Sequence, residues 1–81
     1  MQHLLDDPIS LIVAFTKGKV KPWKLKWGQK IYDIKRVNLI TGSREGRSKI
    51  FFFNVSDDDH AWKLRFNTDT LEWRLVEAYT P

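Results

Sequence analysis

Apolar and polar residues alternate along most of the chain, which is the pattern of half-buried β-strands. In the clearest case, Trp23, Leu25 and Trp27 share one parity and the intervening lysines share the other. Residues 9–15 are instead almost continuously apolar, as in a strand that is covered on both faces. A helical period of 3.6 residues is absent, and a single helical turn is expected only at residues 2–7. The pattern therefore predicts an all-β protein.

Short turns separate these segments, with Gly18 ending the first and Gly28-Gln29 forming a tight hairpin. The six expected strands are residues 9–15, 23–27, 30–40, 49–55, 60–66 and 71–79. Six strands in this order form an antiparallel meander, which we expect to curl into a small barrel or a strongly bent sheet. At 81 residues the chain is long enough for one domain, predicted at 9–81 after a short tail at 1–8.

The third strand changes phase, because its apolar positions switch parity between Ile34 and Val37. A β-bulge near Lys35–Arg36 would keep Leu39 on the inner face. The polar residues 41–48 are typical of a mobile hairpin tip. The aromatic residues expected in the core are Trp23, Trp27, Tyr32, Trp62, Phe66 and Trp73.

The charge is unevenly distributed along a chain whose formal net charge is +4. Six lysines and no acidic residue lie between Pro8 and Tyr32. Such asymmetry is typical of a surface that faces a polyanion, but also of a solvated strand face that keeps a β-protein soluble. The cationic candidates for nucleic-acid binding are Lys17, Lys19, Lys21, Lys24, Lys26, Lys30, Arg44 and Arg47. Asp33 is expected to pair with Lys26 or Lys35 across strands.

Single-strand binders usually add exposed aromatic rings on which bases stack. Here the alternation predicts buried tryptophans unless the barrel is open. Both interpretations of the lysines, a phosphate-binding face and a solvated one, therefore remain open.

A second candidate surface is the run Phe51-Phe52-Phe53, which offers rings to both faces of one strand. One face could bind a partner protein or a second copy, or an exposed edge strand could do so. The alternative to a nucleic-acid role is therefore a protein-interaction or homodimerisation domain.

Motifs for catalysis are missing from the sequence, which has no phosphate-binding glycine loop, nucleophile elbow or zinc-protease motif. The acidic stretch 56–60 (SDDDH) has hard-cation ligands, but a solvated hairpin turn is favoured because it lacks the glycine and distant Glu of a calcium loop. His3 and His60 are the only histidines, and there is no cysteine. We expect no enzyme activity, no metal, no cofactor and no small-molecule substrate.

The absence of cysteine also fits a reducing compartment, so a cytoplasmic location is expected. No apolar run approaches the ~20 residues of a membrane span. The first ten residues lack the basic and apolar regions of a signal peptide. We therefore expect a soluble protein that makes no contact with membranes.

Seven positions of the chain carry a family resemblance: Pro22, Trp27, Gly28, Tyr32, Val37, Phe66 and Trp73. With them, residues 8–79 resemble a small bacterial domain family of unknown function. That family occurs alone and as a tail on some Y-family (translesion) polymerase-like proteins. The chain departs from the family pattern after Val37, where it has no tryptophan, and at Phe66-Asn67, where an acidic residue and tyrosines are usual. The resemblance implies a β-rich fold without a known activity, and the polymerase association favours a nucleic-acid setting.

Overall fold

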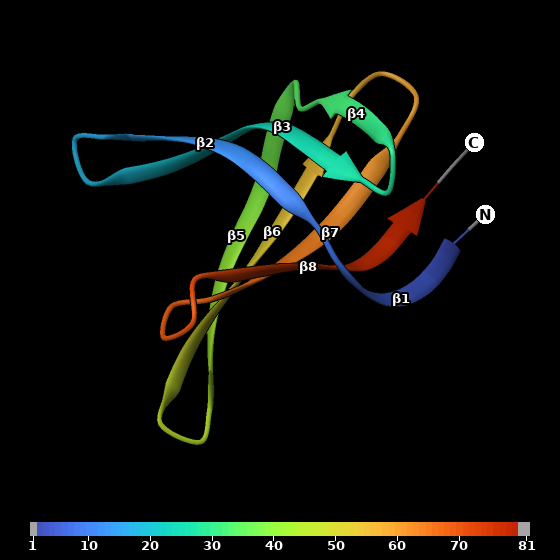
Figure 1. Cartoon of the computed structure of the whole chain (residues 1–81). Helices are drawn as coiled ribbons and strands as arrows, with labels where there is room; N and C mark the ends of the chain where they lie inside the picture. The colour runs from blue at the N-terminus through green and yellow to red at the C-terminus, as the bar shows by residue number, and fades with distance from the viewer. Residues whose placement is uncertain (1, 80–81) are drawn as a thin grey trace.

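The computed structural model describes residues 2–79, with side chains from Leu5 onward, and that part of the chain is built from antiparallel strands without a helix (Figure 1). The strands are β1 Gln2–Pro8, β2 Ser10–Thr16, β3 Lys19–Trp27, β4 Lys30–Asp33, β5 Arg36–Glu45, β6 Ser48–Ser56, β7 Ala61–Asn67 and β8 Glu72–Tyr79. They form a five-stranded sheet in the order β1-β8-β7-β6-β5 and a three-stranded sheet in the order β2-β3-β4. The all-β antiparallel class is thus confirmed, whereas the closed barrel and the count of six strands are wrong.

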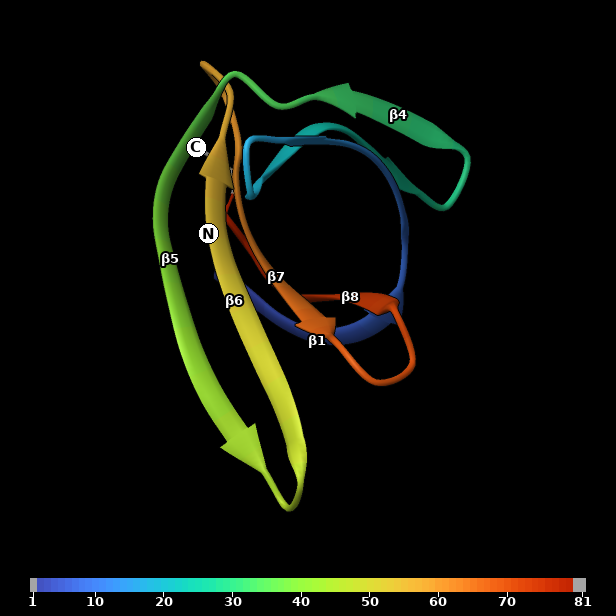
Figure 2. The ribbon, with the colours of Figure 1, turned by 90° about the vertical axis from the view of Figure 1, so that its left-hand side faces the viewer.

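Two corners, where the chain passes from one sheet to the other, explain the higher number of strands (Figure 2). The chain turns between β1 and β2 at Ile9, whose N–H donates to the carbonyl of Trp73 (3.3 Å). It turns again between β4 and β5, where the N–H of Ile34 donates to the carbonyl of Trp23 (2.8 Å). A strand that bends sharply in this way serves two sheets instead of one. The segment predicted as a single strand at 30–40 is therefore divided.

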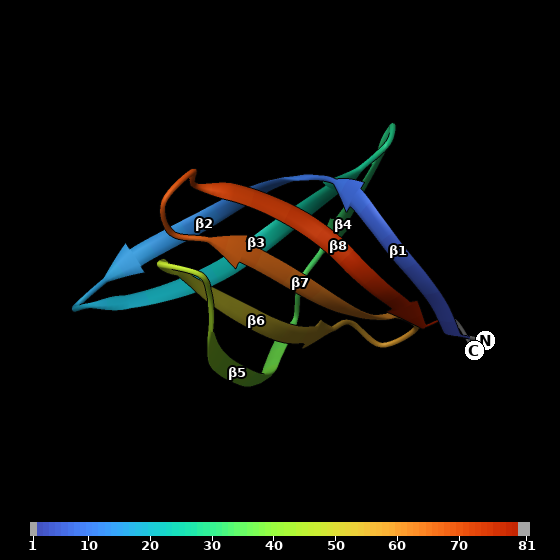
Figure 3. The ribbon, with the colours of Figure 1, turned by 90° about the horizontal axis from the view of Figure 1, so that it is seen from below.

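The first residues are also a strand, because Gln2–Pro8 pair with β8 in place of the expected helical turn. The register runs from Gln2 opposite Tyr79 to Pro8 opposite Arg74, with a shift between Leu4 and Asp7. The first and last described strands are therefore neighbours in the five-stranded sheet (Figure 3).

The core lies between the two sheets. Leu25 of β3 is fully buried against buried residues of the five-stranded sheet, which are Phe53, Val55, Trp62, Leu64, Phe66, Leu75 and Ala78. Of the aromatic residues expected inside, Trp62 and Phe66 are buried, and Trp27, Tyr32 and Trp73 pack against the cluster. These five expectations are confirmed, and that for Trp23 is wrong.

The bulge in β5 lies at Asn38 and not at Lys35–Arg36. Val37 pairs with Val55 on β6, and Leu39 pairs with the preceding residue of that strand, so Asn38 is the extra residue. One inserted residue moves every following side chain of the strand to the opposite face of the sheet. Leu39 is consequently outside the core and 54% exposed, against expectation.

β5 also continues further than predicted, to Glu45. Residues 41–45 pair with β6, so the tip of the hairpin is only Gly46-Arg47. The segment 41–48 is thus mostly strand, although apolar and polar residues alternate little within it and residues 41–45 are exposed.

Candidate functional site

A β-bulge in β3 brings Trp23 out of the core. Two consecutive residues of β2 have Lys24 and Pro22 as their partners on β3, which leaves Trp23 as the extra residue. Pro22 rather than Trp23 is therefore buried on the same side as Leu25. The Trp23 side chain is 53% exposed, directly before the exposed Lys24.

Pro22 explains why the bulge occurs at this point. Proline has no N–H to donate and is confined within sheets to edges, strand starts and bulges. β4 pairs only with residues 24–27 of β3, so β3 has a single neighbour, β2, at Pro22. Pro22 thus lies three residues inside β3, at a point where the strand has no neighbour on its β4 side.

The outer face of the three-stranded sheet, defined here as the side away from the core, combines cations with apolar side chains. Its exposed residues on β3 are Lys19, Lys21, Trp23, Lys24 and Lys26, and those on the neighbouring strands include Ile12, opposite Lys24, and Ile31, opposite Lys26. An aromatic ring thus lies within a row of lysines, which the simple alternation of the sequence did not predict.

One of these lysines has an acidic partner. The ammonium of Lys24 lies 3.1 Å from a carboxylate oxygen of Asp33, which faces it across the β3–β4 register. The expected pairing of Asp33 with Lys26 or Lys35 is therefore wrong. Within residues 2–79, no carboxylate forms an ion pair with Lys19, Lys21 or Lys26.

The other candidate cations lie elsewhere. Lys17 occupies the β2–β3 turn with a positive φ of 49°, and Lys30 begins β4. Arg44 and Arg47 are near the end of the β5–β6 hairpin, which extends in a different direction from the β2–β3 hairpin (Figure 1). The structure thus brings Lys19, Lys21, Lys24 and Lys26 together on one strand and places the two arginines apart from them.

The three consecutive phenylalanines do not form one surface. Phe53 is buried in the core and Phe51 lines a groove beside it. Phe52 is half-buried on the other side of the sheet, with the ammonium of Lys63 5.0 Å from its ring centroid. A partner could therefore not contact all three rings at once.

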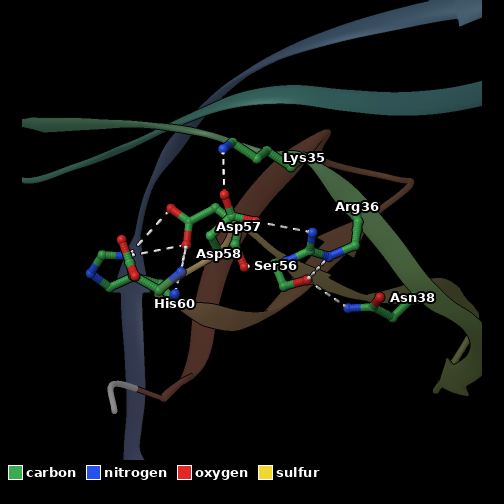
Figure 4. A network of polar contacts seen from close by, with 8 residues as sticks. Lys35, Arg36, Asn38, Ser56, Asp57, Asp58 and His60 are labelled. Atoms are coloured by element: carbon green, nitrogen blue, oxygen red, sulfur yellow. Dashed lines mark hydrogen bonds and ion pairs between the residues drawn. The ribbon is translucent and has the colours of Figure 1, made fainter.

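A polar network connects the acidic stretch 56–60 to the second corner, between β4 and β5 (Figure 4). The ammonium of Lys35 lies 2.7 Å from a carboxylate oxygen of Asp58, and the Arg36 guanidinium contacts the other oxygen at 3.3 Å. Arg36 also donates to the carbonyl of Asp57 (2.5 Å). The hydrogen bond and charge of Lys35, followed by those of Arg36, hold the pKa of Asp58 below its usual range.

Asp57 closes the turn before β7. Burial raises the pKa of Asp57, but the N–H groups of Asp59 and His60 and the His60 ring, all bonded to its carboxylate, outweigh burial and keep the pKa low. The His60 ring stacks on Trp62 (5.5 Å between centroids) and meets Tyr32 edge-on. The expected hairpin turn is confirmed, and its groups contact one another and the core.

The described residues contain no cluster of three or more metal-ligating side chains. They also include no helix that could cross a membrane.

Comparison with known protein families, with curated proteins and with solved structures finds no significant match to this chain. The resemblance to the small bacterial domain family stays a prediction.

Proposed function

We propose that the protein is a non-enzymatic module that binds single-stranded nucleic acid on the outer face of the three-stranded sheet. The observation that carries this proposal is the exposure of Trp23 within the row of β3 lysines. Proteins that bind single strands combine a cationic track for the backbone with aromatic rings for the bases. The bulge supplies the ring in the place where the lysines supply the charge.

Phosphate contacts would come first from Lys19, Lys21 and Lys26, because the ammonium of Lys24 already forms an ion pair with Asp33. Each lysine that neutralises a phosphate on a single strand contributes about −0.7 to the slope of log affinity against log salt. Three to four contacts would therefore weaken binding roughly 20- to 50-fold between about 50 and 200 mM salt.

The indole favours a single strand over a duplex. An unpaired base can stack on an exposed ring, and such stacking is worth about 1–3 kcal/mol per base. In a duplex the bases are already stacked and only the lysines would contribute. Ile12 and Ile31, exposed on either side of the row, add apolar surface for sugars and bases.

The test is fluorescence anisotropy of a labelled oligothymidine and of a matched duplex, titrated with the protein at about 50 and 200 mM salt. We expect tighter binding to the single strand and the steep loss with salt given above. Trp23→Ala should weaken binding to the single strand about 5- to 160-fold, the range that the stacking energy implies, and leave duplex binding almost unchanged.

Lys26→Glu and Arg47→Glu form a matched pair, since both reverse one exposed cation. Lys26→Glu should weaken binding strongly, whereas Arg47→Glu, at the other hairpin, should have a small effect that disappears at higher salt. Equal effects of the two variants, or no binding at low salt, would refute the proposal.

A second candidate is the protein-interaction role, now at the edge strand β5. Arg36–Glu45 pair only with β6 along one side, and Leu39 is exposed on this strand. An edge of this length can accept another strand. Association that persists at high salt, measured by sedimentation of the purified protein, would favour this candidate over the first.

The cytoplasm is the location proposed with either role, because a chain without cysteine fits a reducing compartment. A bacterial origin is proposed from the resemblance alone.

A further inference from the structure

A groove opens between the β2–β3 hairpin and the inner face of β5, β6 and β7. Its volume is about 960 Å³, at the upper end of the range for small-molecule sites. The walls are mainly apolar, formed by Val20, Val37, Ile40, Phe51, Phe53 and Phe66. The groove adjoins the outer face of the three-stranded sheet, on which the nucleic-acid proposal rests, because Lys19 and Lys21 belong to both.

Part of this apolar surface is open to water. Ile40 faces the groove and is 48% exposed, although its pairing partner Phe53 is in the core. Val20 and Phe51 are half-buried. Contiguous apolar side chains that face water from a concavity are typical of a ligand site.

The charge at the groove has one sign. Lys19, Lys21 and Lys35 line it, and no acidic residue does. The ammonium of Lys35 is engaged by Asp58, but the part of the chain that the structure describes offers Lys19 and Lys21 no ion pair. An apolar space with unbalanced cations on its lining complements a molecule with a hydrocarbon body and an anionic head.

The walls do not suit a flat polar ligand such as a nucleobase. Apart from the lysines, the polar side chains of the lining are Thr16 and Thr68, and the hydroxyl of Thr68 already donates to the carbonyl of Lys49 (2.8 Å). The donors and acceptors of a base would largely lose their water without gaining partners, which is unfavourable. A chain of methylene groups has no donors or acceptors that would be left without partners.

We propose that this groove binds a long-chain carboxylate, with the hydrocarbon between Val20, Ile40 and Phe51 and the carboxylate at Lys19 and Lys21. The inference shares Lys19 and Lys21 with the nucleic-acid proposal, but it needs neither Trp23 nor Lys26.

The probe is oleate, titrated into the protein below its micellar concentration and followed by isothermal calorimetry, with methyl oleate in parallel. Saturable binding of one oleate per chain is expected, at least about tenfold tighter than that of the uncharged ester. Absence of saturable binding would overturn the proposal, and equal affinity for acid and ester would overturn the role of the lysines.

Two neighbouring residues of β5 provide a matched pair of variants. Ile40→Glu places a carboxylate in the groove, whereas Leu39→Glu places it on the opposite face of the same strand, and both residues are about half exposed. Ile40→Glu should weaken oleate binding at least about tenfold and Leu39→Glu less than about twofold. An equal effect of both variants would overturn the assignment to this groove.

The same variants separate the two proposals. Oligonucleotide binding should be weakened much less by Ile40→Glu than by Lys26→Glu, and oleate binding should be unaffected by Trp23→Ala. Thermal unfolding of each variant checks that the fold is retained, and the comparison of oleate with its ester needs no variant at all.

Discussion

The indole N–H of Trp27 donates a hydrogen bond to the carboxylate of Asp7, with 3.1 Å between Nε1 and Oδ2. Trp27 ends β3 in the three-stranded sheet, and Asp7 belongs to β1 in the five-stranded sheet. The bond is partly buried and lies beside the first corner, where the chain passes from β1 to β2. It therefore joins the two sheets where the backbone bends.

Removal of this bond should loosen the attachment of one sheet to the other. We expect Trp27→Phe, which retains an aromatic ring, to lower the free energy of unfolding by about 1–2 kcal/mol, because a bond to a charged acceptor is lost. Urea denaturation measures the change. Asp7→Ala should lower stability by a similar amount, and the double variant should be less destabilised than the sum of the two. Strict additivity would show that the bond contributes nothing.

The polar network at the second corner should make the protein sensitive to acid. The pKa values of Asp57 and Asp58 are lowered in the folded protein, so their ionised forms stabilise the fold above the ordinary aspartate pKa of about 3.9. This stabilisation is lost as the pH falls through the lowered folded values. Urea denaturation at neutral pH and at about pH 3 should show the loss.

Asp58→Asn should reduce that pH dependence, because it removes one of the two carboxylates. Asp59→Asn is the control within the same turn, since the Asp59 side chain makes no ion pair with any described residue. A pH dependence that Asp58→Asn leaves unchanged would contradict the role assigned to the network.

Leu71 adopts a left-handed backbone conformation, with a φ of 61°, and its side chain is 70% exposed. This conformation costs a residue with a Cβ about 1–2 kcal/mol, whereas glycine adopts it freely. We expect Leu71→Gly to stabilise the protein by about 0.5–1 kcal/mol, after the greater freedom of glycine in the unfolded chain is subtracted. Thermal unfolding should show a higher midpoint. Leu71→Ala, which retains the strain, should give no comparable increase.

Leu25 anchors the three-stranded sheet, because it is fully buried in the cluster contributed mainly by the other sheet. Leu25→Ala should cost about 2–5 kcal/mol, the usual range for a buried leucine. Ile12→Ala, on the exposed side of the neighbouring strand, should cost less than about 1 kcal/mol. Chemical denaturation of both variants provides the comparison. Similar losses would mean that the two sheets do not share one core.

Much of the fold was predictable because period-two alternation directly reports which side of a strand is buried. It identified Leu25, Trp62 and Phe66 as inward-facing, and the turns at Gly18 and Gly28. It could not show that the segment 30–40 bends from one sheet into another, because a corner depends on which distant strands pair with each half. β1 was missed for a related reason, since its pairing partner lies at the other end of the described chain.

The prediction from the sequence was wrong for Trp23, the central residue of the candidate site. Alternation alone places Trp23 in the core, and a single inserted residue reverses that assignment. Pro22 was the available signal, because a proline within a strand favours a bulge or an edge. The lysines of β3 were identified correctly as exposed, whereas their relation to Arg44 and Arg47 depended on the directions of two hairpins, which no local pattern specifies.

The pairing of β1 with β8 also bears on how the protein is made. The paired positions Gln2 and Tyr79 are 77 residues apart, so at roughly 5–20 residues per second a ribosome needs about 4–15 s between them. During that interval β1 has been synthesised but its partner has not. The nascent chain therefore presents an unpaired strand edge, a substrate for chaperones, until translation has passed Tyr79.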